Sequence, residues 1–174
     1  MRKIIVQISR LLRPDLIRLE MMTSFDYLED DDGGPLTPKR QLERKRLVLA
    51  ECAGLLDLSG RVSNKNKLLT DMFNREKKAT TAIGRGIVIP HIRTMQAKGL
   101  IIGVLRSTPG YEFESLDGML SHIFIPMAAP PYDDTLYLRV FRSLAQIFST
   151  DGFYDRIMSA QQPYDVIRVF EDLE

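Results

Sequence analysis

Two long apolar segments constrain the fold of this chain more than any other feature. Residues 99–107 and residues 119–130 are near-continuous hydrophobic runs. Such runs predict strands that are covered on both faces, because a strand with one face in water alternates apolar and polar residues. Pro126 lies inside the second run and has no N–H to give to a sheet ladder. We therefore expect that strand to end or bulge at Pro126.

Helical patterns alternate with these strands. Pro38, preceded by a threonine, is a typical helix start, and a stripe of apolar residues with helical period follows it. A second stripe ends near Arg75, a third begins at Asp133, and two shorter helices begin at Asp151 and Pro163. Because helices alternate with buried strands, the sequence predicts an α/β fold: a three-layer sandwich in which a mixed central β-sheet is flanked by helices on both faces.

The segment between the first strand and the first helix has the composition of a loop. Residues 17–22 predict a short strand, and residues 24–40 read SFDYLEDDDGGPLTPKR, with three consecutive aspartates, two glycines and two prolines. Such a segment has little with which to build a core. We predict one domain over residues 1–174 with an acidic Gly/Pro loop insertion at about residues 23–41.

Composition and charge exclude several classes of protein. The net charge is +1, so there is no global attraction to nucleic acid or to an acidic membrane, and the basic stretch at residues 39–46 is interpreted as a solvated helix face. No apolar run approaches the roughly 18 residues that a membrane span needs. Cys52 is the only cysteine of the sequence, so an internal disulfide is excluded. It lies in an apolar helical stretch, which predicts that its side chain is buried. These features predict a cytoplasmic protein without nucleic-acid partners or membrane insertion.

The stretch IGRGIVIPHIR contains a glycine turn. Gly84 and Gly86 are two residues apart, but the third glycine of a dinucleotide fingerprint is missing, and no Walker lysine follows. Thr80 and Thr81 precede the turn, and Arg75 lies a few residues earlier. Hydroxyls, backbone amides and a guanidinium group suit a phosphoryl group, so these residues are candidates for phosphate binding.

His91 ends this stretch, directly after a proline. By its chemistry it is a candidate phosphoryl acceptor, metal ligand, general base or packed side chain. A metal site has little support, because the other histidine, His122, lies in an apolar strand and no cluster of ligands accompanies it. A hydrolase triad has little support either, because no G-x-S-x-G motif is present. We expect no metal and no cofactor.

Seventeen residues around this histidine carry a resemblance to a known family. REKKATTAIGRGIVIPH, residues 75–91, resembles the signature of enzyme IIA domains of the fructose, mannitol and nitrogen-regulatory class, which belong to the phosphoenolpyruvate:sugar phosphotransferase system. GLIIGVLRSTPGYEFESLDG and LYLRVFRSLAQIF are similar to a strand with its acidic loop and to a helix of that family. Residues 1–22 and 42–172 can be laid on the family pattern.

The resemblance implies a phosphocarrier, a phosphotransferase-system protein with a phosphohistidine intermediate. His91 would accept a phosphoryl group from an HPr-like carrier protein, and Arg75 would hold the phosphoryl oxygens. The group would pass to a IIB domain or a regulatory target, or its presence would be read as a signal, most simply in a nitrogen-regulatory protein. Tyr137 occupies the place of the family's second histidine, so a non-catalytic interaction module is the alternative. The other departures from the family pattern are Ala82, Val88 and Ile92.

Overall fold

The computed structural model describes residues 6–28 and 34–174. The helices are α1 (Pro38–Asp57), α2 (Lys65–Lys78), α3 (Asp134–Phe148), α4 (Phe153–Ser159) and α5 (Pro163–Leu173). The strands are β1 (Ile17–Arg18), β2 (Ala82–Gly84), β3 (Ile87–Val88), β4 (His91–Arg93), β5 (Ile101–Ile102), β6 (Val104–Tyr111), β7 (Ser121–Phe124) and β8 (Met127–Ala129). Short 3-10 helices lie at Ile8–Arg10, Pro14–Leu16 and Asp26–Leu28.

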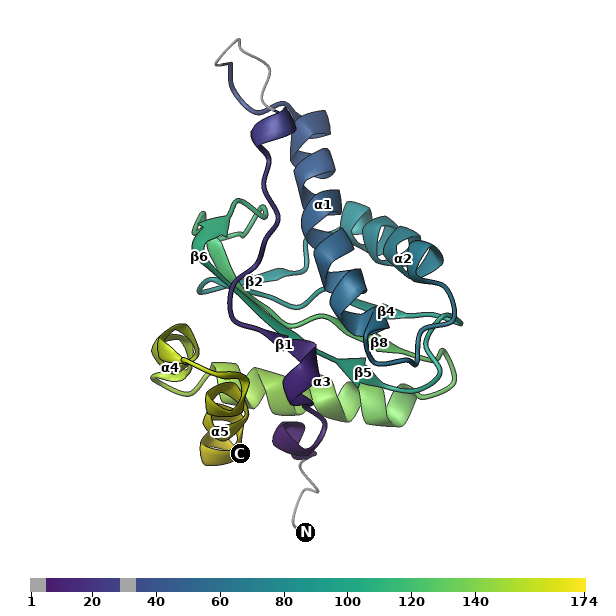
Figure 1. Cartoon of the computed structure of the whole chain (residues 1–174), viewed down its shortest axis with the longest axis vertical. Helices are drawn as coiled ribbons and strands as arrows, with labels where there is room; N and C mark the ends of the chain where they lie inside the picture. Colours follow the sequence, from purple (N-terminus) through teal and green to yellow (C-terminus); the bar gives the residue numbers. More distant parts are fainter. Residues whose placement is uncertain (1–5, 29–33) are drawn as a thin grey trace.

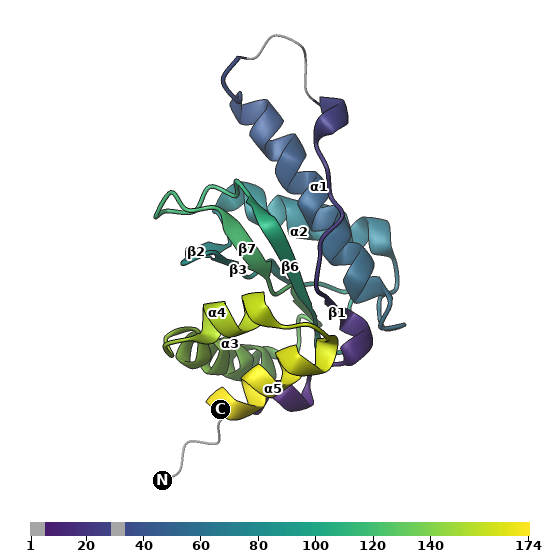
Figure 2. The same cartoon turned by 60° about the vertical axis from the view of Figure 1, so that its left-hand side comes forward.

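Helices cover both faces of the strand layer (Figures 1 and 2). α1 and α2 lie on one face, and α3, α4 and α5 lie on the other. Two clusters of buried apolar side chains correspond to these faces: one joins the strands to α1 and α2, and the other joins them to the three C-terminal helices. The predicted three-layer α/β sandwich is confirmed.

The alternating direction of strand side chains explains the long apolar runs. Ile123, Ile125 and Met127 pack into the cluster of the C-terminal helices, whereas Phe124 and Ala128 pack into the cluster of α1 and α2. Successive side chains of a strand point to opposite faces, and here both faces are covered by helices. Every position along these strands is therefore apolar.

The strand layer is divided into two sheets along one line. One sheet has the order β1-β6-β7-β3-β2 and the other the order β4-β8-β5. Pro126 separates β7 from β8, and Gly103 separates β6 from β5 and donates its N–H to the Pro126 carbonyl at 3.0 Å. Pro90 separates β3 from β4, and its carbonyl accepts the Met127 N–H at 2.8 Å. Because proline cannot donate, regular pairing stops at this level and resumes beyond it.

These breaks decide how the strand predictions compare with the structure. The expectation that residues 119–130 are interrupted at Pro126 is confirmed. The run at residues 99–107, predicted as one strand, forms two, because Gly103 lies opposite Pro126, which has no N–H to donate to it. A Cβ at this position would lie 2.8 Å from the Leu55 side chain and 3.1 Å from the Leu16 carbonyl oxygen, so the residue at the break is a glycine. β1 is shorter than the predicted strand at residues 17–22.

The first helix begins where its sequence predicts. The Thr37 hydroxyl accepts the Arg40 N–H, and Pro38 is the first helical residue. Residues 38–41 of the predicted insertion thus belong to α1, and residues 29–33 of it lie outside the described residues. Cys52 is fully buried, as expected, and burial raises the pKa of its thiol. None of the helices in the described part of the chain is long and apolar enough to cross a membrane.

Candidate functional site

His91 is the first residue of β4, immediately after the break at Pro90. Its ring is half-buried, and its Nδ1 lies 2.6 Å from the backbone carbonyl oxygen of Ile89. A carbonyl oxygen only accepts hydrogen bonds, so Nδ1 carries the ring proton and donates it. Nε2 therefore keeps its lone pair and is the nucleophilic nitrogen of this histidine.

Arg75, in the last turn of α2, lies next to that lone pair. Its Nη2 is 3.3 Å from the His91 Nε2, and its Nη1 donates to the Ala79 carbonyl oxygen at 3.0 Å. The second bond holds the guanidinium against the end of its own helix. The two residues that the sequence paired as acceptor and phosphate clamp are thus brought together, from different elements.

A pocket of about 560 Å³ opens at this pair. It is lined by Arg75, His91, Ile92, Arg93, Pro131 and Tyr137. The Phe141 ring meets the His91 ring nearly at a right angle, with 4.7 Å between ring centroids, and the Tyr137 ring centroid is 6.4 Å from that of His91. Tyr137 of α3 therefore lines the pocket together with the guanidinium of Arg75, and Phe141 of the same helix packs against the His91 ring.

Burial sets the protonation states in this pocket. It lowers the pKa of His91, and the positive charge of Arg75 lowers it further. Burial also raises the pKa of Tyr137, so its phenol is neutral at physiological pH. Near neutral pH the pocket holds a neutral, nucleophilic imidazole beside a permanent cation.

The lowered pKa of His91 predicts how stability depends on pH. The ordinary value is 6.5, so as the pH falls below it the unfolded chain binds a proton before the folded chain does. His91 should therefore lower the free energy of unfolding as the pH falls from about 6.5 through the folded pKa, and leave it unchanged above. Urea unfolding at several pH values would measure this. In His91→Gln the stability should fall less over that window, and an identical slope would contradict the expectation.

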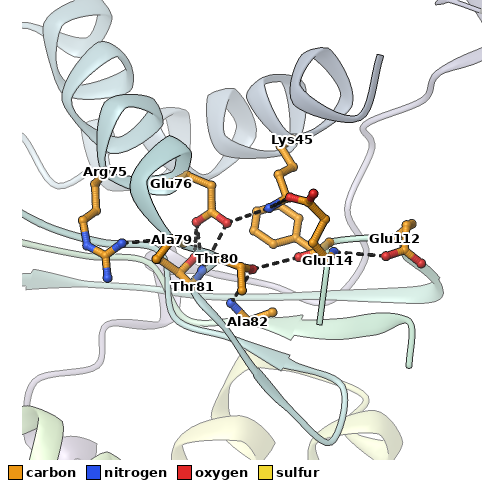
Figure 3. Close-up of polar contacts among 10 residues, drawn as sticks. Lys45, Arg75, Glu76, Ala79, Thr80, Thr81, Ala82, Glu112 and Glu114 are labelled. Atoms are coloured by element: carbon orange, nitrogen blue, oxygen red, sulfur yellow. Dashed lines mark hydrogen bonds and ion pairs between the residues drawn. The ribbon is translucent and has the colours of Figure 1, made fainter. Parts of the chain in front are cut away.

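A buried ion pair supports the end of α2 from which Arg75 projects (Figure 3). The Lys45 ammonium of α1 lies 2.9 Å from the Glu76 carboxylate, and these residues are 2% and 3% exposed. Glu76 also accepts the backbone N–H and the hydroxyl of Thr81. Glu114 pairs with Lys45 from the other side. This network joins α1, the last turn of α2 and the start of β2, and thereby fixes the backbone that carries Arg75.

The threonines predicted to bind phosphate are engaged in other contacts. The Thr80 hydroxyl donates to the Phe113 carbonyl oxygen at 3.0 Å, and the buried Thr81 hydroxyl donates to Glu76. Neither side chain lines the pocket of His91. The structure therefore does not bring these two side chains to the histidine. Their hydroxyls form hydrogen bonds with Phe113 and Glu76, which are closer polar partners.

The glycine turn also lies away from His91. Gly84, Arg85 and Gly86 all have positive φ and connect β2 to β3, and β3 runs from this turn toward His91 over roughly 16 Å. The Arg85 N–H donates to the Asp117 carboxylate at 2.7 Å. The turn does hold an anion, but that anion is a carboxylate of the same chain. A phosphate-binding role for Gly84 and Gly86 stays a prediction that this geometry does not support.

Sequence reasoning missed three contributors to this region. Lys45 lies in the basic stretch interpreted as a solvated helix face, but it is buried against Glu76, a partner that only the fold brings near. Phe141 packs on the His91 ring. Arg93 lines the pocket, and its position two residues after His91 on a strand was a signal that could have found it, since such residues share a side.

In residues 6–28 and 34–174, no three His, Cys, Asp or Glu side chains gather where they could hold a metal ion. The expectation that the chain needs neither metal nor cofactor stays a prediction.

Known proteins resemble the chain in sequence and in fold. It is 27% identical over 127 residues to the fructose-specific EIIABC component of the phosphotransferase system of Bacillus subtilis, a match that covers 73% of this chain and 20% of that protein. It is 26% identical over 144 residues to the nitrogen regulatory protein of Pseudomonas aeruginosa, which covers 80% of this chain and 94% of that protein. The chain thus spans about a fifth of the first relative and nearly the whole of the second.

The fold matches that of the nitrogen regulatory protein IIA-Ntr from Neisseria meningitidis, with a TM-score of 0.76, 22% sequence identity and coverage of 95% of this chain and 99% of that one. The family model of the EIIA 2 domain of the phosphoenolpyruvate-dependent sugar phosphotransferase system matches residues 36–173, which include His91, Arg75 and Tyr137. The chain belongs to this EIIA 2 family of the phosphotransferase system.

Proposed function

We propose that this chain is a phosphocarrier in which His91 accepts a phosphoryl group from an HPr-like phosphohistidine carrier. The observation that carries the proposal is the 3.3 Å approach of the Arg75 guanidinium to the His91 Nε2 at a pocket of about 560 Å³. The hydrogen bond to Ile89 keeps the proton on Nδ1, so we assign Nε2 as the acceptor. Arg75 would hold the phosphoryl oxygens with its planar fork of donors.

The transfer needs no other protein nucleophile. The His91 Nε2 lone pair forms the new N–P bond while the donor's P–N bond breaks, and that electron pair stays on the donor imidazole. Each ring keeps the proton on its other nitrogen, so the positive charge of the phosphorylated ring moves with the phosphoryl group. Phosphoryl transfer depends mainly on positioning and charge stabilisation. The fixed His91 ring supplies the first, and Arg75 contributes to the second.

For the downstream step we propose the nitrogen-regulatory type. The 26% identity over 144 residues to the nitrogen regulatory protein of Pseudomonas aeruginosa supports it. The phosphoryl group would pass to a IIB domain or to a regulatory target protein, or the target would read the phosphorylation state. A single domain over residues 1–174 and a cytoplasmic location belong to the same proposal.

The test is phosphorylation in a reconstituted system. The chain is incubated with labelled phosphoenolpyruvate, enzyme I and an HPr-like carrier, and the protein-bound label is measured before and after mild acid treatment. Acid-labile label that depends on the carrier is the expected result, since phosphohistidine hydrolyses in acid. Absence of label with every HPr-like carrier tried would overturn the proposal.

The second candidate is an interaction module that kept the fold and lost phosphotransfer. The neutral Tyr137, in the place of the family's second histidine, is the observation that favours it. This module would bind its partner without becoming labelled, so the same experiment separates the two candidates.

Arg75→Ala should slow phosphorylation of His91 by about 10²- to 10³-fold, because one preorganised donor to the transferred group is lost. Stability should change little, since Arg75 is only half-buried and makes one backbone bond at its helix end. The initial rate of labelling and the thermal midpoint Tm measure the two effects.

Lys67→Ala is the matched control for this substitution. It removes one cation from the first turn of the same helix, and its side chain is exposed. Its labelling rate should equal that of the unmodified chain. A rate for Arg75→Ala within a few-fold of this control would refute the role of Arg75 as a phosphate clamp.

A further inference from the structure

We propose that Arg93 is a second cationic ligand of the phosphoryl group on His91, aimed by Tyr137 and Asp134 of α3. This inference rests on the proposed function, and it assigns a role to a residue outside the histidine–arginine pair. It also gives Tyr137 a role that needs no charge of its own.

The position of Arg93 on β4 directs it toward the same space as His91. The two residues are separated by one position on the strand, so their side chains leave the same side, roughly 7 Å apart. Both line the pocket described above. Ile92, between them, packs against the buried cluster of α1 and α2 and also borders the pocket. An extended arginine side chain is long enough to span the gap to a group on the His91 Nε2.

The first turn of α3 holds the Arg93 guanidinium. Asp134 forms an ion pair with its Nη1, and its Cζ lies 5.6 Å from the centroid of the Tyr137 ring. Asp134 and Tyr137 are three residues apart and so lie on one face of the helix. A cation over the face of an aromatic ring is attracted by the ring's quadrupole, which makes Tyr137 a platform for Arg93. A guanidinium group has five N–H donors, so the bond to Asp134 leaves donors for phosphoryl oxygens.

A cation at Arg93 matters because the group that the pocket would hold is strongly negative. A phosphoryl group on histidine is a dianion, and the cationic side chains that line the pocket are Arg75 and Arg93. Burial keeps Tyr137 neutral by raising its pKa and disfavours the charged form of His91 by lowering its pKa. Two guanidinium forks suit a dianion better than one. The positive charge that a histidine would bring to the place of Tyr137 is supplied here by the arginine that packs on the tyrosine ring.

The test uses the full chain and potassium phosphoramidate, a small phosphoryl donor that needs no carrier protein. In this reaction the donor's P–N bond breaks, its nitrogen leaves as ammonia, and the His91 Nε2 takes the phosphoryl group. Phosphohistidine formation is followed by ³¹P NMR, in parallel with labelling by the HPr-like carrier. The variants are Arg93→Met and Arg93→Lys, with Arg168→Met on the exposed side of α5 as the control. Tm is measured for each.

Arg93→Met should react about 10- to 100-fold more slowly with both donors, the loss expected for a hydrogen bond to a charged group. Arg93→Lys should recover part of the rate because it restores the charge, and Arg168→Met should react like the unmodified chain. Tm should be unchanged in all three, since the Arg93–Asp134 pair is exposed, with side chains 47% and 60% accessible.

Each other outcome decides the question. If the unmodified chain is labelled and Arg93→Met is labelled at the same rate, the role of Arg93 is overturned and the proposed function stays intact. A loss of rate shared equally by both Arg93 variants, with an equal fall in Tm, would assign Arg93 a purely structural role and overturn the inference. If neither donor phosphorylates the unmodified chain, the proposed function fails, and the role of Arg93 fails with it.

Discussion

His91→Ala is expected to abolish phosphorylation of this chain completely. The substitution removes the Nε2 lone pair that lies beside Arg75. Tyr137 also lines the pocket, but burial raises the pKa of its phenol, which therefore stays neutral and is a poor replacement as nucleophile. The backbone of β4 and its pairing with β8 do not depend on the imidazole, so the fold should persist. Acid-labile label from phosphoenolpyruvate, enzyme I and the carrier measures the effect, with circular dichroism as the check on folding.

His122→Gln is the matched control, because it removes the other histidine of the chain. His122 lies on β7, where its Nδ1 contacts the Ser107 carbonyl oxygen at 3.0 Å and its ring packs against Tyr154. We expect this variant to be labelled at the rate of the unmodified chain. Label that survives in His91→Ala and disappears in His122→Gln would move the acceptor to β7 and contradict the assignment.

Lys45→Ala is expected to produce the largest loss of stability, about 3–5 kcal/mol in the free energy of unfolding. The substitution leaves the Glu76 carboxylate buried, at 3% exposure, without the ammonium that lies 2.9 Å away. The two bonds that Glu76 accepts from Thr81 remain but do not neutralise its charge. Urea unfolding of the variant and of the unmodified chain measures the difference.

Two further variants separate a lost charge pair from lost packing. The double variant Lys45→Met, Glu76→Gln removes both charges at similar volume, so it should be markedly more stable than Lys45→Ala. Arg156→Met breaks the exposed pair with Asp172, whose side chains are 39% and 51% accessible, and should cost less than about 1 kcal/mol. A loss in Lys45→Ala no larger than that in Arg156→Met would refute the buried ion pair as a main support of α2.

The predictable part of the fold is the part that depends on local apolar pattern. A strand covered on both faces needs apolar residues at every position, and residues 119–130 satisfy this requirement whatever the rest of the chain does. Pro126 interrupts its strand for an equally local reason, because it has no N–H. Gly103 interrupts its run for a reason that lies in another strand: it is opposite Pro126, which accepts the Gly103 N–H and has no N–H to donate in return. That neighbour comes from the tertiary structure, and no pattern within residues 99–107 contains it.

The candidate site divides in the same way. The motif from Arg75 to His91 was enough to nominate these two residues, because its spacing is similar to that of a known family. The motif was not enough for the polar residues between them. A hydroxyl bonds to the nearest suitable partner, and for Thr81 that partner is Glu76, held in place by Lys45 of another helix. The amide of Arg85 in the glycine turn likewise bonds to Asp117, more than thirty positions along the chain.

The sequence by itself determined the buried strands, the helices on either side of them, and the histidine and arginine of the motif, because each depends on residue types at short, regular spacing. Only the tertiary structure decided which polar groups lie close enough to interact. It aligned Pro90, Gly103 and Pro126 at one level of the strand layer, and it brought Arg93 over Tyr137 beside His91. Such meetings join residues from separate elements, and their distances follow from how the helices pack on the sheets and not from any one segment.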